Sequence, residues 1–281
     1  MLKGVTEISE HYDFINSFFD DSKFCDPHLT AMIEAGEKIE DMMAKKDHHG
    51  FVTVNNEEIT GLFILLIISE EKYLEMLIGL TRDENSVKEL LSFMGKNFPG
   101  YEADFVFNPN NCLIKDILEK HGADFDKEQI KMVYTHKSCT CDVTCIEPLS
   151  AAYNDQYLAL HSKDMYWTGE KIIQATDCFK TFVAVEGGIV TGYIDVTHCH
   201  AENEPYDLYV RKEYRRKGYG RQLLAMALID NEPKDMMVLV DYDNIPAINL
   251  YESMGFVKKK NGNILTAFWK IVTIQHHTDF S

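Results

Sequence analysis

The sequence predicts an α+β fold made of two copies of one domain, because two separate segments repeat at nearly the same spacing. The segments 111–122 and 244–255 each begin with Asn, carry Glu at the same place and end with Gly, 133 residues apart. The pattern Phe-Val-x-Val occurs at 51–54 and again at 182–185, 131 residues apart. A small change of spacing between blocks fits a loop of different length in the two copies. A chance resemblance between the halves is the alternative.

The repeat divides the chain of 281 residues into a first domain, residues 1–137, and a second domain, residues 138–281. The join lies in a polar stretch rich in Thr and Cys between residues 136 and 148. Each copy has the size of an ordinary domain. The composition, with 45% hydrophobic and 26% charged residues, is typical of globular proteins and excludes a disordered chain.

The second copy carries the clearer signals of secondary structure. Two segments that alternate apolar and polar residues flank Gly187 and Gly188, which predicts a β-hairpin. Leucines and alanines at helical spacing between 219 and 229 predict a helix. The predicted helices are 153–161, 168–175, 219–229 and 246–254, and the predicted strands are 181–186, 189–197, 205–210, 237–240 and 265–272.

The charge balance limits the classes of partner. Asp and Glu number 45 against 28 Lys and Arg, so the net charge is −17. A chain this acidic is a poor candidate for binding nucleic acid, which needs a basic face. Acidity favours a cationic or amine partner, although solubility alone is the alternative explanation. Since the sequence has neither an apolar run of membrane-spanning length nor the core of a signal peptide, we expect a cytoplasmic protein without membrane segments.

The cysteines and histidines do not predict a metal site or disulfides. Seven cysteines without an export signal indicate reduced thiols. The cluster of Cys139, Cys141 and Cys145 lacks the spacing of a zinc ribbon, and His198 with His200 offers only two ligands. No metal is therefore expected.

One segment of the second copy has the features of an anion-binding loop. A predicted strand ends at Val210, a helix is predicted to begin near Tyr219, and the loop between them reads Arg-Arg-Lys-Gly-Tyr-Gly over 215–220. Glycines allow close approach of the backbone, and a helix N-terminus presents free N–H groups. Residues 211–221 hold six basic side chains and one acid. These features predict a pyrophosphate cradle. A solvated basic loop is the alternative, and the Walker and Rossmann patterns are absent.

The same loop resembles the (Q/R)-x-x-G-x-(G/A) signature of the GNAT superfamily, the acetyl-CoA-dependent N-acetyltransferases. The preceding strand and the segment 244–256, with Asn244, Ala247, Leu250, Tyr251 and Gly255, resemble two further landmarks of that family in the same order. The resemblance covers residues 146–275, and residues 1–137 only through the repeat. It implies two tandem GNAT-like domains, each a mixed, mainly antiparallel twisted sheet flanked by helices.

The resemblance also implies roles for single residues, with acetyl-CoA as cosubstrate. Backbone groups of Leu208, Tyr209 and Val210 would pair with the pantetheine arm, which Asn244 would also contact. Tyr251 would protonate the departing thiolate, with a purely structural core tyrosine as the alternative. The pyrophosphate would be held by the loop residues Arg215, Arg216, Lys217, Gly218, Tyr219, Gly220 and Arg221.

The implied chemistry is direct attack of an amine on the thioester, which needs a group that accepts the proton of the amine. Glu204 and Asp207 are the candidate bases at the start of the predicted strand, and Glu204 is ranked first. Ordinary surface acids are the alternative for both.

The first copy lacks these features. When 133 is subtracted, Asn85 and Val87 stand where the second copy has Gly218 and Gly220, and Leu118 stands where it has Tyr251. Two acids, Asp83 and Glu84, replace cations of the loop. We therefore expect residues 1–137 to be a degenerate, non-catalytic copy.

The function that we predict is acetyl transfer from acetyl-CoA to a primary amine of a small molecule. The alternatives are a transferase that uses another acyl or aminoacyl donor, and a regulatory module that binds acyl-CoA without catalysis. The expected partner is the small-molecule amine, and the sequence leaves open whether the chain forms a homodimer.

Overall fold

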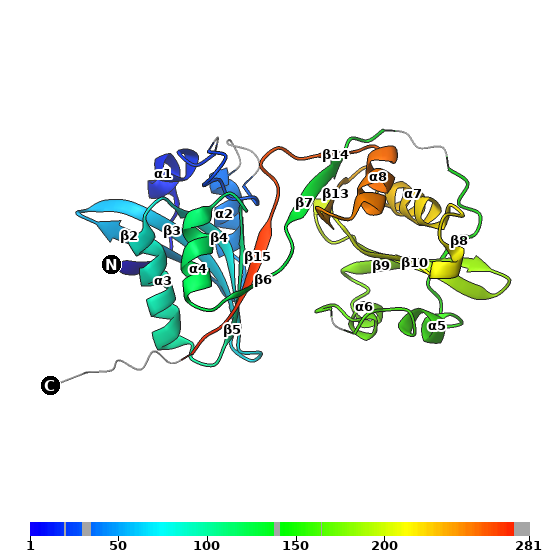
Figure 1. Ribbon diagram of the computed structural model, residues 1–281, viewed down its shortest axis with the longest axis horizontal. Coiled ribbons are helices and arrows are strands. Elements are labelled where there is room, and N and C mark those ends of the chain that lie inside the picture. Colours follow the sequence, from blue (N-terminus) through cyan, green and yellow to red (C-terminus); the bar gives the residue numbers. More distant parts are fainter. Residues whose placement is uncertain (20, 30–34, 138–140, 164, 273–281) are drawn as a thin grey trace. The chain divides into compact units, whose positions relative to one another are not determined.

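The computed structural model describes residues 1–19, 21–29, 35–137, 141–163 and 165–272, which form two compact units (Figure 1). Unit 1 comprises residues 1–130 and 260–281, and unit 2 comprises residues 131–259. Each unit combines β-sheet with helices, as the α+β prediction required. Within the described residues, no helix is long and apolar enough to cross a membrane.

Unit 1 is built on a seven-stranded sheet in the order β1-β2-β3-β4-β5-β15-β6. All neighbours are antiparallel except β4 and β5, which are parallel. The helices are α1 (Tyr12–Asn16), α2 (Ala35–Met43), α3 (Glu84–Asn97) and α4 (Cys112–Lys120). The strands are β1 (Leu2–Val5), β2 (His48–Asn55), β3 (Glu58–Ile68), β4 (Tyr73–Thr81), β5 (Glu102–Phe107), β6 (Asp124–Phe125) and β15 (Leu265–Lys270).

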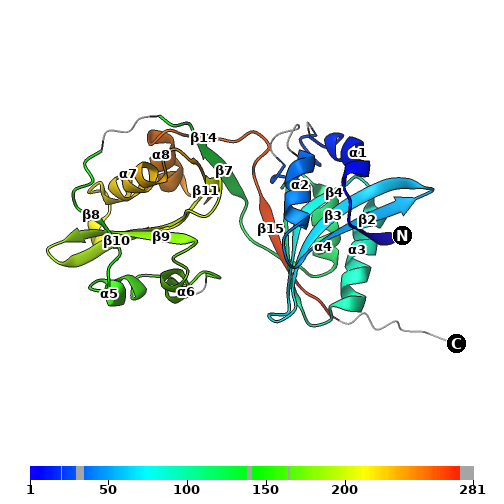
Figure 2. The same ribbon diagram turned by 180° about the vertical axis from the view of Figure 1, so that it is seen from behind.

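Unit 2 has two four-stranded sheets, β12-β10-β9-β8 and β11-β13-β7-β14. Figures 1 and 2 show α7 and α8 on one side of β9 and β10, and α5 and α6 on the other. The helices are α5 (Asn154–Leu158), α6 (Gly169–Gln174), α7 (Tyr219–Asn231) and α8 (Ile245–Ser253). The strands are β7 (Gln129–Tyr134), β8 (Ile146–Pro148), β9 (Phe179–Glu186), β10 (Ile189–Thr197), β11 (Glu202–Asn203), β12 (Pro205–Val210), β13 (Asp235–Asp241) and β14 (Phe256–Lys258).

The two units repeat the same strand order, once β11 and β12 are taken as one interrupted strand equivalent to β4. The register agrees as well. Gly61 pairs with Thr81 in unit 1, and Gly192 pairs with Val210 in unit 2. Both strand pairs then show a register shift three residues further along β3 and β10. The internal repeat of the sequence is thus a repeat of structure.

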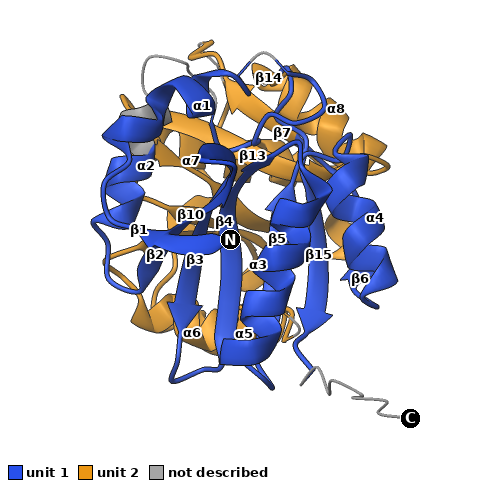
Figure 3. Ribbon diagram, turned by 90° about the vertical axis from the view of Figure 1, so that its left-hand side faces the viewer, with its two compact units in different colours: residues 1–130, 260–281 blue, residues 131–259 orange. Residues whose placement is uncertain are grey.

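The two units exchange their last strands, which a division at residue 137 does not anticipate. β15, from the end of the chain, lies between β5 and β6 in unit 1 (Figure 3). β7, from the end of the first half, lies between β13 and β14 in the second sheet of unit 2. The predicted domains 1–137 and 138–281 therefore differ from the units observed. The sequence predicts that 265–272 is a strand, but it does not determine which sheet the strand joins.

Most ends of the predicted helices and strands lie within two residues of the observed ends. The short strands β8, β11 and β14 were not predicted. β10 pairs with β9 as the predicted hairpin requires. Every residue of β10 from Val190 to Val196 is buried, because α5 contacts one face of the strand and α7 the other (Figure 1). Asp195, at the centre of β10, is fully buried.

Candidate active site

The centre of unit 2 is a place where two neighbouring strands part. β11 pairs with β13 in parallel through Glu202 and Asn203. The chain then continues as β12, which pairs with β10 on one edge only and forms the end of its sheet. No ladder joins β12 to β13 in the described residues. The N–H of Arg211 donates to Thr191 of β10, so by alternation the backbone groups of Tyr209 also face β10. Those of Leu208 and Val210 lie on the edge that faces away from β10 and is available to an outside partner.

The basic loop lies directly after β12 and ends at the start of α7. Residues 215–218 are exposed, and Gly218 is the N-cap of α7 with φ of +95°. No side chain caps the first turn of this helix. Because the first amides of a helix have no partner within the helix, the start of α7 presents free N–H groups beside a cluster of cations.

The two glycines of the loop are not required by packing within the protein. A Cβ atom at Gly218 would meet nothing within 4 Å, and one at Gly220 would make ordinary contacts with Leu250 and Leu208 at 3.6 and 3.7 Å. The positive φ explains a glycine at 218. At 220, the missing side chain leaves room above the helix terminus, which fits the approach of a phosphate group.

The basic side chains of the loop make different contacts. Nε of Arg215 donates to the carbonyl oxygen of Val210 at 2.9 Å, so that this carbonyl already has a partner. Arg221 donates to Oγ of Ser253 at 2.8 Å and ties the start of α7 to the end of α8. Arg216 is exposed, and Nζ of Lys217 lies 4.7 Å from the ring centre of Tyr214.

Glu204 lies at the point where the strands part. It stands between β11 and β12, and the backbone N–H of Leu239 on β13 donates to its carboxylate. Burial raises the pKa of Glu204 to about 7, although this hydrogen bond and the charge of Lys131 act in the opposite direction. A carboxyl group whose pKa is close to neutral can accept a proton and release it again.

Tyr251 faces the same region from α8. Its side chain is 6% exposed and packs edge-on against Phe256 at 5.4 Å between ring centres. Within the described residues its hydroxyl group makes no hydrogen bond. Burial and the negative charges of Glu204 and Asp207 raise the pKa of Tyr251, so the hydroxyl keeps its proton at neutral pH. These two charges act on Tyr251 because the three side chains lie near one another.

Asn244 is the N-cap of α8 and is exposed. Its side-chain oxygen accepts the N–H of Ala247 at 3.3 Å. The local reason for an asparagine here is therefore helix capping. A contact with a cofactor would have to come from its amide nitrogen.

Sequence reasoning missed a buried polar cluster behind β12, which we name the Asp207 network. Oδ2 of Asp207 accepts the hydroxyl of Tyr193 at 2.5 Å. Asp195 accepts hydroxyl groups from Tyr157 and Thr181, and Nε2 of His161 lies 3.2 Å from its Oδ2. Asp195, an acid inside an otherwise apolar strand, was the feature of the sequence that indicated this cluster, because a buried carboxylate needs hydrogen-bond partners. The network consists of Tyr157, His161, Thr181, Tyr193, Asp195 and Asp207.

The metal-like patterns considered in the sequence have other contacts. Cys139 lies outside the described residues, and Sγ of Cys145 donates to Gln222 at 2.8 Å. His198 faces the carbonyl of Thr176 at 3.2 Å, and His200 faces the thiol of Cys199 at 3.3 Å. Among the described residues, three potential ligand atoms come within 4.8 Å of one another in the Asp207 network alone, from His161, Asp195 and Asp207.

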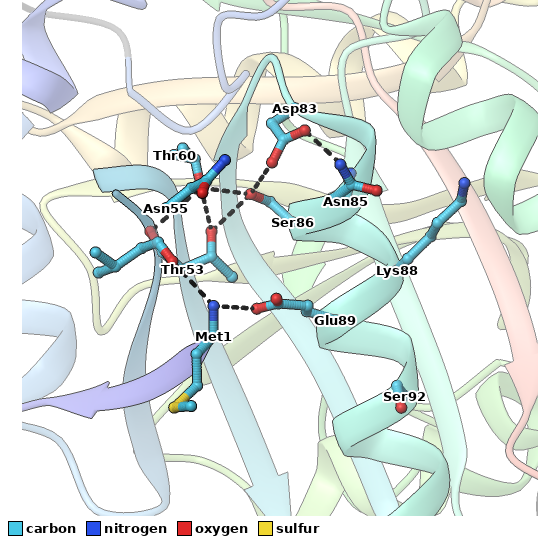
Figure 4. Close-up of a pocket in the computed structure, with 11 residues that line it drawn as sticks. Met1, Thr53, Asn55, Thr60, Asp83, Asn85, Ser86, Lys88, Glu89 and Ser92 are labelled. Carbon is cyan, nitrogen blue, oxygen red and sulfur yellow. Dashed lines mark hydrogen bonds and ion pairs between the residues drawn. The ribbon is translucent and has the colours of Figure 1, made fainter. Parts of the chain in front are cut away.

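The start of α3, the equivalent helix in unit 1, differs from that of α7. Only residues 82 and 83 connect β4 to α3, whereas residues 211–218 connect β12 to α7. Asp83 caps α3 by accepting the N–H of Asn85 at 3.2 Å, and its carboxylate also accepts the hydroxyl of Ser86 at 3.1 Å (Figure 4). A carboxylate thus lies where unit 2 leaves free amides.

The edge of β4 in unit 1 is also occupied. Oδ2 of Asp26 accepts the N–H of Gly79 at 2.9 Å, and Asp26 is buried. By register, Gly79 corresponds to Leu208 of β12, since they pair with Phe63 and Ile194 at equivalent places. The protein itself therefore fills, in unit 1, a hydrogen-bonding position that remains open in unit 2.

Comparison with known proteins supports the same fold. Across almost its whole length the chain is similar to a GCN5-related N-acetyltransferase from Sphaerobacter thermophilus, with a TM-score of 0.65, 11% identity and coverage of 97% of this chain and 96% of that one. It is also similar to a tandem GNAT protein from the clavulanic acid biosynthesis pathway, with a TM-score of 0.54, 12% identity and coverage of 96% and 99%. These likenesses establish the fold alone.

A third similar structure is the glucosamine N-acetyltransferase region of a fungal multi-domain GH3 β-N-acetylglucosaminidase, with a TM-score of 0.58 and 11% identity. The match covers 96% of this chain and 38% of that one. No curated protein sequence matches the chain. The family model described as "Acetyltransferase (GNAT) domain" matches residues 177–258, from the start of β9 to the end of β14. Residues 177–258 of this chain therefore belong to the GNAT family of acetyltransferase domains.

Proposed function

We propose that unit 2 transfers the acetyl group of acetyl-CoA to a primary amine of a small molecule. The observation that carries the proposal is the opening between β12 and β13. At one end lies a glycine-containing basic loop before an uncapped helix, and at the other end lie Glu204 and Tyr251. The open edge of β12 thus connects a basic region, which suits the anionic part of a cofactor, with a region that suits proton transfer.

The residues would act in the following way. The amides at the start of α7, with Arg216, Lys217 and the free nitrogens of Arg215 and Arg221, hold the pyrophosphate. The backbone of Leu208 binds the pantetheine arm, and Val210 contributes its N–H rather than its carbonyl. The backbone of Tyr209, which the resemblance also assigned to the arm, faces β10 instead. Asn244 contacts the arm through its amide.

The chemical step forms one C–N bond and breaks one C–S bond. The neutral amine attacks the thioester carbonyl after Glu204 has accepted its proton, directly or through water. The tetrahedral intermediate then collapses, and the sulfur leaves as a thiolate. Tyr251, which is protonated at neutral pH, gives its proton to that sulfur and produces free CoA. The attacking nitrogen, which became cationic when the C–N bond formed, releases its extra proton to water and becomes the neutral amide nitrogen. Tyr251 regains a proton from water.

In this proposal unit 1 does not bind acetyl-CoA. The carboxylates of Asp83 and Asp26 occupy the helix start and the strand edge that would receive the phosphate and the pantetheine. Leu118, the counterpart of Tyr251, is fully buried in the core and has no proton to donate.

Titration calorimetry with acetyl-CoA and a thiol-release assay with a panel of amines test the proposal. We expect one acetyl-CoA site per chain and thiol release that depends on an added amine. Binding without amine-dependent release would favour the regulatory module, and no binding would favour another acyl donor. Two sites per chain would contradict the assignment of unit 1.

The rate should depend on pH through Glu204. Because burial raises its pKa to about 7, a falling pH protonates the base, and kcat/KM should fall about tenfold per pH unit below that value. The Glu204→Gln variant should lose this dependence on pH, with acetyl-CoA affinity unchanged. Asp230→Asn, which removes a carboxylate paired with Lys180 at 2.7 Å and away from Glu204, is the control and should keep the wild-type profile. A profile of unchanged shape in the Glu204 variant would remove this residue from the mechanism.

A further inference from the structure

The Asp207 network has two acidic side chains, Asp195 and Asp207, and one basic side chain, His161. Nε2 of His161 lies 3.2 Å from Asp195 but 3.9 Å from Asp207. The imidazole therefore pairs mainly with Asp195, which is fully buried. Among the described residues, Asp207 has no closer cationic partner than this ring.

The ring of His161 is held from both sides. Its Nδ1 atom lies 2.9 Å from the carbonyl oxygen of Ser162, and its Nε2 atom lies 3.2 Å from Oδ2 of Asp195. The side chain is 1% exposed, so the imidazole has a fixed place behind Asp207.

Asp207 has both a fixed position and access to the site. The hydroxyl of Tyr193 holds Oδ2, and the Tyr193 ring stacks on His161 at 5.4 Å. Oδ1 has no hydrogen-bond partner among the described residues, and the side chain is 23% exposed. Asp207 lies on β12 close enough to Tyr251 for its charge to act on that hydroxyl. The buried partners thus hold a carboxylate in place with one oxygen free.

Aromatic rings lie beside this carboxylate. Tyr206 precedes Asp207, and its hydroxyl accepts the backbone N–H of Trp167 at 3.4 Å. Phe179 packs against both rings, 5.0 Å from Trp167 and 5.8 Å from Tyr206. Aromatic faces next to a carboxylate are a favourable environment for an organic cation.

We propose, on the basis of the proposed function, that Asp207 binds a second amino group of the acceptor in its ammonium form. The acceptor would then be a diamine or polyamine rather than a monoamine or an amino acid. The amine that attacks must be neutral, and Glu204 serves that amine. A carboxylate fixed by Tyr193 and His161 suits a charge that persists through the reaction, so Asp207 determines specificity and the two residues behind it act in positioning.

A divalent metal ion is the competing occupant, because His161, Asp195 and Asp207 supply three ligand types that metals accept. The hydroxyl groups of Tyr157 and Thr181 already donate hydrogen bonds to Asp195, and the hydroxyl of Tyr193 donates to Oδ2 of Asp207. The oxygen that remains free is Oδ1 of Asp207. This arrangement favours an ammonium group at the exposed side over a metal ion at the centre.

Three acceptors of equal chain length test the proposal on the full-length protein: 1,4-diaminobutane, 4-amino-1-butanol and 4-aminobutyrate. They share the amine to be acetylated and differ only in the charge at the far end. With the wild type, kcat/KM for the diamine should exceed that for the alcohol by about tenfold or more, after allowance for its two equivalent amines, and the carboxylate should be the poorest.

Asp207→Asn should raise KM for the diamine by about tenfold to a hundredfold and leave KM for acetyl-CoA unchanged. The diamine and the alcohol should then become equivalent. Tyr193→Phe, which releases Oδ2, should shift KM in the same direction by a smaller factor. Asp230→Asn is the matched control, since it removes an exposed carboxylate paired with Lys180 at 2.7 Å and should keep the wild-type preference.

Calorimetric titration of 1,4-diaminobutane into the protein saturated with CoA gives a readout without turnover. Binding that Asp207→Asn weakens at least tenfold supports the proposal. Equal use of the three acceptors, a preference that survives in the variant, or no diamine binding would overturn it. Stoichiometric binding of Zn²⁺ or Mn²⁺ that His161→Gln abolishes would overturn it in favour of a metal site. Thiol release with monoamines alone would overturn this inference but leave the acetyltransferase proposal intact, whereas failure of acetyl-CoA itself to bind would contradict that function.

Discussion

Replacement of Gly218 and Gly220 together by glutamate is expected to weaken acetyl-CoA binding by more than about 100-fold. Each charge-assisted hydrogen bond from a helix N-terminus to a phosphate contributes about 1.5–3 kcal/mol, so loss of two bonds corresponds to at least that factor. The new carboxylates would in addition repel the diphosphate and could cap the amides themselves, as Asp83 does in unit 1. Titration calorimetry measures the change directly.

The matched control places the same two substitutions at Gly187 and Gly188. These glycines also have positive φ, +59° and +80°, and a Cβ atom there would meet nothing within 4 Å. Both double variants therefore add two negative charges to unit 2. The control carries at least as much backbone strain, because both of its glycines have positive φ, whereas in the loop pair only Gly218 does. The control should bind acetyl-CoA within about threefold of the wild type. If the Gly218 and Gly220 double variant does so too, the anion-binding loop lies elsewhere.

A pair of milder substitutions separates charge from shape. Asn tolerates positive φ better than other residues, and Gly220 has room for a methyl group at 3.6 Å from Leu250. Gly218→Asn should therefore retain most of the affinity. Gly220→Ala should also retain most of it, because the added methyl group makes only ordinary contacts with Leu250 and Leu208 and brings no charge.

The basic loop is a part of unit 2 whose counterpart in unit 1 could not be identified by counting residues. Subtracting 133 aligned Gly218 with Asn85, and that correspondence is wrong, because the connection in unit 2 contains an insertion that unit 1 lacks. The register of the sheets instead aligns Val210 with Thr81, at a different spacing. Repeated residues identify equivalent helices and hairpins, but loop residues between them have no common backbone and cannot be matched by counting.

The pairing of strands that are distant in the chain could not be predicted from the sequence, for a similar reason. The segment 265–270 reads as a strand because its side chains alternate between buried and exposed. That pattern depends on the two faces of a sheet and is the same beside any neighbour. Its place between β5 and β6 depends on the path of the whole chain.

The two parts of the candidate site also differed in how far the sequence could predict them. The loop and Tyr251 lie in one contiguous stretch, where spacing carries information. The Asp207 network joins α5, β9, β10 and β12, and Tyr157 is separated from Asp207 by a large part of unit 2. Only Asp195, an acid in an apolar strand, gave a local signal, and its meaning depended on knowing that both faces of β10 are covered.

Replacement of Tyr251 by phenylalanine is expected to lower kcat about 100-fold and to leave acetyl-CoA affinity unchanged. A positioned general acid contributes at least about that factor, and without it the thiolate must leave unprotonated or take its proton from water. The substitution removes only the hydroxyl, which makes no hydrogen bond in the described part of the chain, so packing against Phe256 and the melting temperature should be preserved. Pre-steady-state thiol release measures the step.

Two further observations distinguish a proton donor from a structural tyrosine. Burial and the charges of Glu204 and Asp207 raise the pKa of Tyr251, so the wild-type kcat should stay level as the pH rises from 8 to 10, where an ordinary tyrosine begins to lose its proton. Tyr242→Phe, at a tyrosine that is 56% exposed on the adjoining loop, should behave as the wild type throughout. A kcat for Tyr251→Phe within about threefold of the wild type would mean that the sulfur is protonated by another group, and the hydroxyl would then have no part in the reaction.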